Sequence, residues 1–321
     1  VDTVSATLVS VGNAGLFKNF ETVDLKGAAS GGSLDAALMT NSSISGVALS
    51  GATGGGTFTV SNLTGTDVKV TVSDNTGSSV GAVYATLASS AGTSDTATLT
   101  FAATSSGTTE SVLGKLKTTG IESLNIASGG TLAASTDTIK NTLTLFEDAS
   151  NKTAAITVTG SNAFVLGAYT DATTYTDGVE QYTTAPTTAI ADATTAAGLK
   201  TIDASAATAA VTIVAGETQS DVHGSSGTTD LVFTGLVITG GAGADKLVNL
   251  AAAGVVNAGA GNDAITVTGA AAVVDGGAGN DTITVNASVS TTLTGGAGRD
   301  TFVVSAATAG SAYATAPKTT T

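Results

Sequence analysis

Gly240-Gly241-Ala242-Gly243-Ala244-Asp245 is the first of four related hexapeptides in the C-terminal third of the chain. The other three are Ala258-Gly259-Ala260-Gly261-Asn262-Asp263, Gly276-Gly277-Ala278-Gly279-Asn280-Asp281 and Gly295-Gly296-Ala297-Gly298-Arg299-Asp300. They begin at residues 240, 258, 276 and 295, so successive copies are separated by 18, 18 and 19 residues. A near-constant separation indicates a repeat architecture, in which each copy is one unit of a stacked structure.

An apolar residue follows each aspartate after one intervening position. These residues are Leu247, Ile265, Ile283 and Phe302. A strand, a turn, a second strand and a second turn fit into one such repeat, and they form one coil of a parallel β-roll whose coils stack about 4.8 Å apart. Apolar residues such as Leu247, Ile265 and Ile283 then point inward and stack, while the segments 255–256, 273–274 and 289–293 supply the opposite strand. The sequence therefore predicts an all-β fold, a parallel β-roll or β-solenoid.

The region upstream of the repeats is less regular but also favours strands. Thr, Val and Ile alternate in short runs that are separated by Gly-rich and Asn-rich gaps, which is typical of strands and turns. These runs are residues 57–60, 68–72, 97–101, 142–146, 156–158 and 211–214. We expect three parts: a β-rich, solenoid-like region at 1–220, a roll at 221–305 and a tail at 306–321.

A second, weaker repeat has apolar residues at its first, fourth and sixth positions. It occurs at 20–25, 121–126 and 199–204. Either these segments are the same rung of a solenoid, or they coincide by chance in a chain of low complexity. Residues 167–198 are expected to form a loop, and single helical turns are expected at 34–39 and 113–117.

Composition excludes several classes of protein. The 321 residues include 41 glycines, no cysteine and one histidine, His223. Disulfide scaffolds, thiol nucleophiles and zinc sites built from cysteine or several histidines are therefore excluded. Residues 77–81 match the G-x-S-x-G pattern of hydrolases, but the strand–turn–helix context and a nearby histidine are missing. We expect no enzymatic activity.

Charge and hydropathy narrow the choice of partners. The chain carries 25 acidic and 11 basic side chains, a net charge of −14 at pH 7. This balance argues against nucleic acid as a partner and suits the binding of cations. No run of about 18 apolar residues is present, so we expect no transmembrane helix.

The four hexapeptides and the apolar position after them resemble the G-G-x-G-x-D-x-U-x nonapeptide of RTX proteins, a calcium-binding β-roll repeat. The resemblance covers residues 240–303 and implies calcium ions between the turn of one coil and the turn of the next. Four motifs would bind three such ions. The implied carboxylate ligands are Asp245, Asp263, Asp281 and Asp300. The implied carbonyl ligands are Gly241, Gly243, Gly259, Gly261, Gly277, Gly279, Gly296 and Gly298, with Asn262 and Asn280 at the typical fifth position.

The residue types suit this chemistry. Calcium takes six to eight oxygen ligands at about 2.3–2.6 Å, and glycine adopts the positive φ angles that direct carbonyl groups toward an ion. Stacked carboxylates about 5 Å apart repel one another by about 0.8 kcal/mol in water and about 3 kcal/mol at an effective dielectric constant of 20. We therefore expect residues 225–305 to be loose without calcium and ordered with it.

Some positions depart from the motif or leave its extent open. Ala258 replaces a glycine, and Arg299 at the fifth position of the last motif is expected to weaken binding there. Asp230 belongs to an incomplete earlier motif and is either a ligand or part of a capping turn. Upstream carboxylates could bind further calcium or lie on solvated strand faces; these are Glu21, Asp24, Glu122 and Asp203.

The richness in Ala, Thr, Gly, Ser and Val also resembles bacterial surface-layer proteins of the RTX type. This resemblance implies type I secretion, a location outside the bacterium on its cell surface, and calcium-dependent self-assembly into a lattice or filament. Its partners would be further copies of itself and cell-surface polysaccharide. The alternatives are an RTX adhesin or matrix protein that binds a cell-surface partner, and the calcium module of a larger secreted enzyme. RTX proteins normally continue beyond the repeats, so we expect a truncated C-terminal tail.

Overall fold

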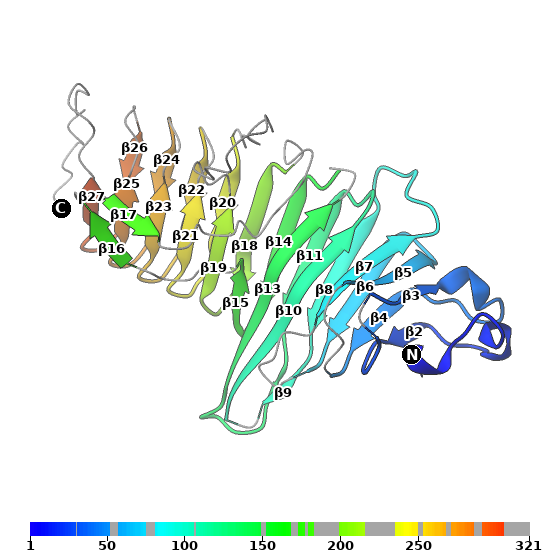
Figure 1. Ribbon diagram of the computed structural model, residues 1–321. Coiled ribbons are helices and arrows are strands. Elements are labelled where there is room, and N and C mark those ends of the chain that lie inside the picture. Colours follow the sequence, from blue (N-terminus) through cyan, green and yellow to red (C-terminus); the bar gives the residue numbers. More distant parts are fainter. Residues whose placement is uncertain are drawn as a thin grey trace.

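Two long parallel sheets face each other and form a β-solenoid (Figure 1). The computed structural model describes residues 1–29, 31–51, 57–74, 81–105, 107–148, 152–167, 173–176, 179–182, 199–215, 235–249, 253–267, 271–285 and 291–304. One sheet has 12 strands and the other has 11 strands, and every pairing within them is parallel. The all-β, parallel solenoid predicted from the sequence is confirmed.

Each sheet takes one strand from successive coils. The 12-stranded sheet consists of β1 (Thr3–Ser5), β2 (Thr22–Asp24), β4 (Gly46–Leu49), β6 (Asp67–Val72), β8 (Thr96–Phe101), β11 (Ser123–Ser128), β14 (Ala155–Gly160), β18 (Thr201–Ala207), β20 (Val237–Thr239), β22 (Val255–Asn257), β24 (Val273–Asp275) and β26 (Thr292–Thr294). The 11-stranded sheet consists of β3 (Ser33–Asp35), β5 (Thr57–Leu63), β7 (Ala82–Leu87), β10 (Thr108–Thr118), β13 (Thr138–Asp148), β15 (Ala163–Leu166), β19 (Val211–Ala215), β21 (Lys246–Asn249), β23 (Ala264–Val267), β25 (Thr282–Val285) and β27 (Thr301–Val304).

The remaining elements are short. β9 (Thr104–Ser105) pairs with β12 (Thr131–Leu132), and β16 (Thr173–Thr176) pairs with β17 (Val179–Tyr182) in an antiparallel hairpin. Three 3₁₀ helices lie in the N-terminal coils, namely η1 (Ala6–Leu8), η2 (Ala14–Leu16) and η3 (Ala36–Leu38). The described part of the chain contains no helix with the length and apolar character that a membrane-spanning segment requires.

Strand register stacks the apolar side chains of the repeats. Leu247 pairs with Ile265, and Ile265 pairs with Ile283. All three are at most 1% exposed, so the inward column predicted from the sequence is confirmed for them. Phe302 continues the register but is 42% exposed, because it lies in the last strand of its sheet. Alternation of side chains across each strand therefore places one apolar row per strand in the core.

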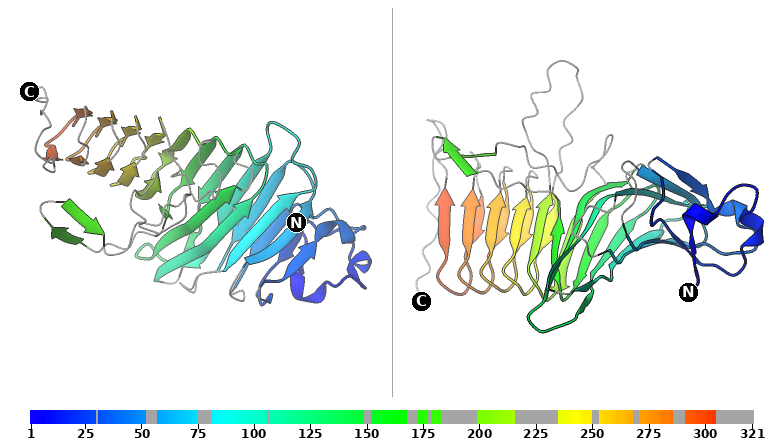
Figure 2. Two further views of the ribbon diagram at one scale, coloured as in Figure 1. Left: turned by 45° about the horizontal axis from the view of Figure 1, so that its top comes forward. Right: turned by 60° about the horizontal axis from the view of Figure 1, so that its bottom comes forward.

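The core extends along the whole solenoid and is widest in the middle. Figure 2 shows that strands lengthen from the short ones of the C-terminal coils to β10 and β13, and shorten again toward the N-terminus. Three buried aromatic rings, those of Phe101, Phe146 and Phe164, lie in this wide part. Phe101 and Phe164 lie with their ring centroids 6.0 Å apart, and Phe146 is 1% exposed.

Most expectations for the upstream region are confirmed. All six predicted runs lie within strands, namely β5, β6, β8, β13, β14 and β19. The weak repeat is a shared rung, because its three copies overlap β2, β11 and β18, which belong to the same sheet. The copies come from coils that are not adjacent, and this explains their irregular spacing.

Of the two helical turns predicted from the sequence, one is present and the other is not. The helical turn expected at 34–39 contains η3, whereas the one expected at 113–117 is wrong because these residues lie in β10. β10 pairs with β13 over its length, and the salt bridges of Lys115 and Lys117 with Glu147 of β13 reinforce this pairing. Tertiary pairing therefore overrides the local preference of this short segment. The loop expected at 167–198 contains the β16–β17 hairpin.

The proposed parts of the chain share the same sheets. β18 pairs with β20, and β19 pairs with β21, so both sheets pass from the upstream region into the roll. The division at 220/221 therefore stays a prediction, and the tail at 306–321 lies outside the described residues.

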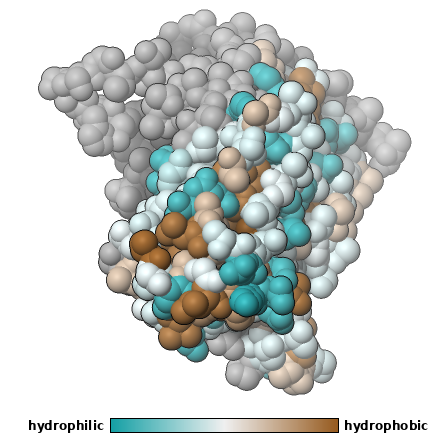
Figure 3. All heavy atoms as spheres, turned by 90° about the vertical axis from the view of Figure 1, so that its right-hand side faces the viewer, coloured by the Kyte–Doolittle hydropathy of each residue, from teal (hydrophilic) through white to brown (hydrophobic). Residues whose placement is uncertain are grey.

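The N-terminal end of the solenoid presents apolar side chains to solvent. Leu8, Val11 and Leu16 are 62%, 82% and 77% exposed. Figure 3 faces this end and shows apolar patches among polar surface. β1 and β3 are the last strands of their sheets here, so their outer edges have no partner strand within the described part of the chain.

Candidate metal centre

The four hexapeptides form successive turns on one side of the roll. We call residues 240–245, 258–263, 276–281 and 295–300 the glycine turns, numbered one to four. Each one connects a strand of the 12-stranded sheet to the next strand of the 11-stranded sheet. The third positions of turns two to four form parallel bridges, Ala260 with Ala278 and Ala278 with Ala297. Equivalent atoms of these turns therefore lie above one another along the solenoid.

The four aspartates form a hydrogen-bonded ladder. The backbone N–H of Asp245 donates to Oδ1 of Asp263 at 2.8 Å, and that of Asp263 donates to Oδ1 of Asp281 at 2.9 Å. The N–H of Asp281 donates to Oδ1 of Asp300 at 3.1 Å. One oxygen of each of the last three carboxylates thus joins consecutive coils. The structure brings the four predicted carboxylates into a single column.

The second oxygens of two of these carboxylates have no partner among the described residues. Oδ2 of Asp263 and Oδ2 of Asp281 are buried and receive no hydrogen bond there. The residues themselves are 2% and 1% exposed. A buried oxygen anion without a partner is strongly unfavourable unless a cation or another donor compensates it. These two atoms are therefore suited to bind a cation.

The glycines are required by both backbone conformation and space. The second and fourth positions of turns two to four have φ between 92° and 137°. A Cβ atom on Gly277 would lie 2.0 Å from the carbonyl oxygen of Gly259, and one on Gly279 would lie 1.7 Å from that of Gly261. Any larger residue would push neighbouring coils apart. The expectation of positive φ is confirmed for six glycines and is wrong for Gly241 and Gly243, whose φ angles are outside this region.

The glycine turns also contain backbone carbonyl oxygens that could bind a cation. The carbonyls of Gly241, Gly259 and Gly277 accept hydrogen bonds from the next coil at 2.7–3.1 Å. No described residue donates to the carbonyls of Gly261 and Gly279. A carbonyl oxygen has two lone pairs, so both sets retain the capacity to bind a cation.

The fifth residue of the glycine turns joins one turn to the next. The backbone N–H of Asn280 donates to Oδ1 of Asn262, and the N–H of Arg299 donates to Oδ1 of Asn280, both at 2.8 Å. This amide ladder joins successive turns at their exposed edge. It also explains why asparagine at this position suits a stacked turn, whereas Arg299 ends the ladder.

Burial and mutual repulsion disfavour the ionised form of the aspartates. Burial, aided by the charges of Asp245 and Asp281, raises the pKa of Asp263 to about 6, against the lowering effect of the hydrogen bond from the N–H of Asp245. Burial likewise raises the pKa of Asp281, with contributions from Asp300 and Asp275. A divalent cation in the column would reverse this effect by stabilising the carboxylates.

The donor set fits calcium. Among the described residues no three acidic, histidine or cysteine side chains converge on one point, so a site here must combine carboxylates with backbone carbonyls. Carboxylate and carbonyl oxygens are the ligands that calcium takes, and the close glycine packing provides the cradle. The calcium prediction remains a prediction, but these residues satisfy its chemical requirements.

The upstream carboxylates already have partners within the protein. Glu21 accepts from the N–H of Asp2, Asp24 from the hydroxyl of Ser50, and Asp203 from the N–H of Ser205. These contacts favour a structural role over a cation site. His223 and Asp230 lie outside the described residues.

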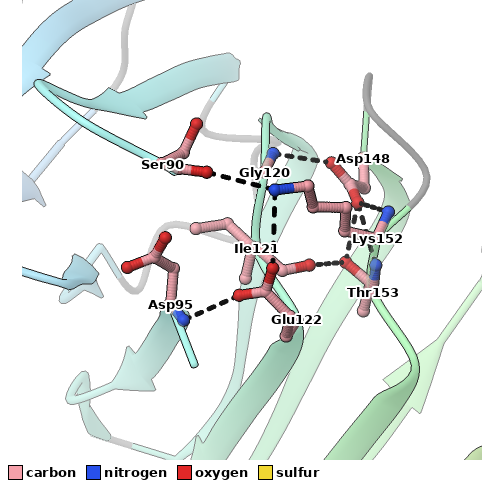
Figure 4. Close-up of polar contacts among 8 residues, drawn as sticks. All are labelled: Ser90, Asp95, Gly120, Ile121, Glu122, Asp148, Lys152 and Thr153. Atoms are coloured by element: carbon pink, nitrogen blue, oxygen red, sulfur yellow. Dashed lines mark hydrogen bonds and ion pairs between the residues drawn. The ribbon is translucent and has the colours of Figure 1, made fainter. Parts of the chain in front are cut away.

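A second polar cluster lies on the opposite side of the solenoid, and of its members only Glu122 stood out in the sequence. Lys152 extends across three consecutive coils, where its Nζ donates to the carbonyl of Ser90 at 3.1 Å and lies 3.7 Å from Oε1 of Glu122 (Figure 4). Asp148 accepts from the N–H groups of Lys152 and Thr153 at 2.6 and 2.9 Å. The lysine supplies the positive charge of this cluster, which joins consecutive coils.

Comparisons with protein-family models, with curated proteins and with solved structures found no match to this chain.

Proposed function

We propose that the chain is a calcium-binding protein of the RTX type, with calcium between the glycine turns of adjacent coils. The observation that carries the proposal is that two buried oxygens of the aspartate column, Oδ2 of Asp263 and Oδ2 of Asp281, have no partner among the described residues. Backbone carbonyls of the glycine turns would complete the set of ligands, and those of Gly261 and Gly279 accept no hydrogen bond from a described residue. The resemblance of the four motifs to RTX nonapeptides agrees with this choice.

Calcium suits the column better than other divalent cations. The available donors are oxygens, and nearly all nitrogen and sulfur ligands are absent because the chain has one histidine and no cysteine. Magnesium requires near-ideal octahedral geometry and retains its water, whereas calcium accepts six to eight oxygens in variable geometry. Irregular sites made of stacked carbonyls and carboxylates therefore favour calcium.

Calcium would couple binding to folding in the roll. Without it, Asp263 and Asp281 must remain protonated or bear uncompensated charge in the core. With it, the carboxylates become ligands and the stacked turns are stabilised. Since such a site scarcely exists in the unfolded chain, the free energy of binding adds to the free energy of folding.

The biological role that we propose is structural: a self-assembling protein of the bacterial cell surface, secreted into calcium-containing medium. The composition typical of surface-layer proteins supports it. So does the N-terminal end, where the edges of β1 and β3 have no partner strand in the described chain and Leu8, Val11 and Leu16 are exposed. Exposed strand edges and apolar patches are common sites of association between chains.

Negative-stain electron microscopy tests the structural role. The purified chain would be imaged in millimolar calcium and in EGTA at equal ionic strength, with magnesium as a control. We expect ordered sheets or filaments in calcium alone. Discrete particles under all three conditions would contradict self-assembly and would favour the adhesin alternative, while leaving calcium binding to be measured separately.

A further inference from the structure

The first glycine turn differs from the other three in the partners of its aspartate. Both carboxylate oxygens of Asp245 accept hydrogen bonds from backbone groups, Oδ1 from the N–H of Val211 at 2.8 Å and Oδ2 from the N–H of Gly241 at 2.7 Å. Asp245 is as deeply buried as Asp263, at 2% exposed, yet it leaves no oxygen without a partner. Two backbone N–H groups of the protein therefore already meet the hydrogen-bonding needs of this carboxylate.

The backbone of the first turn explains the difference. Gly259, Gly277 and Gly296 have φ angles of 102°, 92° and 96°. Gly241 occupies the same position in the first turn, but its φ is outside the left-handed region, and its N–H points at the aspartate of its own turn. In the third turn the equivalent N–H, that of Gly277, donates to Asp275 instead. A change of backbone conformation at one glycine thus decides whether Oδ2 of the aspartate has a donor.

The coil before the first turn contributes no carboxylate. Residues 207–210, which are the last residue of β18 and its connection to β19, read Ala-Thr-Ala-Ala. The first turn packs closely on this connection, because a Cβ on Gly241 would lie 2.5 Å from the carbonyl oxygen of Ala207 and one on Gly243 would lie 2.4 Å from the nitrogen of Ala210. The first turn is therefore fitted to a coil without carboxylate ligands.

We infer that Asp245 is a positioning residue that joins the roll to the preceding coil, and that the roll binds two calcium ions, between turns two and three and between turns three and four. This inference rests on the proposed function. Asp263, Asp281 and Asp300 are then the carboxylate ligands, and Asp281 is shared by both ions. The sequence alone, in which all four motifs carry an aspartate, implies three ions.

Counting bound ions tests the inference directly. Native mass spectrometry of the full chain in calcium would be compared for the unaltered protein, Asp245→Asn and Asp281→Asn. We expect two ions for the unaltered protein, two for Asp245→Asn and fewer than two for Asp281→Asn. Three ions in the unaltered protein and two in Asp245→Asn would overturn the role of Asp245 alone. Zero ions in the unaltered protein would overturn the proposed function as well.

Amide hydrogen exchange tests the positioning role of Asp245 independently of the number of bound ions. In Asp245→Asn the amide nitrogen at the Oδ2 position would face the N–H of Gly241, so two donors would meet. We expect exchange of the Gly241 amide to become about tenfold faster, which corresponds to the loss of one hydrogen bond. In the unaltered protein the amides of Val211 and Gly241 should be equally protected in calcium and in EGTA. Loss of their protection in EGTA would contradict the inference, because it would make this junction depend on calcium.

Discussion

Replacing Gly279 by alanine should open the roll locally. Gly279 has a φ of 137°, and the new Cβ would lie 1.7 Å from the carbonyl oxygen of Gly261 in the adjacent coil. The backbone strain alone costs about 1–3 kcal/mol for a residue other than glycine. The contact also forces the two coils apart, and this weakens the hydrogen bonds between them, from Gly261 N to Ala278 O at 2.8 Å and from Ala278 N to Gly259 O at 2.9 Å. Each such bond contributes about 1 kcal/mol, so the total loss should be about 3–5 kcal/mol.

Two other glycines separate the contributions. Gly65 has a φ of 94°, but a Cβ added to it would have no atom within 4 Å, so Gly65→Ala should cost only the backbone strain. Gly12 has neither a left-handed φ nor a close neighbour, so Gly12→Ala should change stability by less than about 0.5 kcal/mol. The three variants therefore form a graded series in which only Gly279→Ala affects the contact between coils.

Native-state hydrogen exchange in millimolar calcium is the suitable assay, because it reports the free energy of opening for each coil separately. Amides of β23 and β25 should lose protection in Gly279→Ala and keep it in the two controls. If Gly279→Ala were no more destabilising than Gly65→Ala, the close approach of the glycine turns would be refuted, and with it the column of ligands.

Three further predictions concern calcium, pH and the polar cluster. Removing calcium with EGTA should accelerate exchange of amides in 253–304 and leave the wide coils around β10 and β13 protected; uniform protection under both conditions would contradict a calcium-dependent roll. Because the pKa of Asp263 is raised to about 6 in the folded state, its protonated form stabilises the fold below about pH 4 and this contribution is lost as the pH rises through about 6. Urea titrations without calcium should therefore show lower stability at pH 7 than at pH 5, by about 1 kcal/mol from Asp263, whereas with calcium this difference should disappear or reverse. Asp148→Asn should lower stability by about 2–3 kcal/mol because buried N–H donors lose their charged acceptor, whereas Lys152→Ala, which removes a half-exposed ammonium group, should cost less than about 1 kcal/mol; equal losses would contradict the assigned roles.

The sequence predicted the fold well because the repeats carry their own register. Copies at near-constant spacing with an apolar residue after each aspartate require parallel stacking, and Leu247, Ile265 and Ile283 do stack. The upstream coils lack a constant spacing, since their strands differ in length, so the sequence predicted their strands and a solenoid-like region but not the order in which the strands pair. The helical turn predicted at 113–117 was wrong because the pairing of β10 with β13, which is distant in sequence, decides the conformation of this segment.

The candidate site was predicted in position but not in detail. Four identical aspartate positions offered no reason to distinguish Asp245 from Asp263. The difference arises from the φ angle of Gly241, which depends on packing against the connection at 207–210 rather than on the motif itself. The Lys152 cluster was missed because Ser90, Glu122 and Asp148 come from three separate coils, which only the stacking brings together.

Isothermal titration calorimetry with calcium tests the central claim most directly. The EGTA-treated and dialysed chain would be titrated beside a variant that combines Asp263→Asn with Asp281→Asn, which removes the two carboxylates of the aspartate column that have an oxygen without a described partner but keeps the size of each side chain. The account predicts saturable calcium binding to the unaltered chain, with release of protons to the buffer near pH 6, and loss of this binding in the variant. Equal binding by both proteins, or none by the unaltered chain, would contradict it.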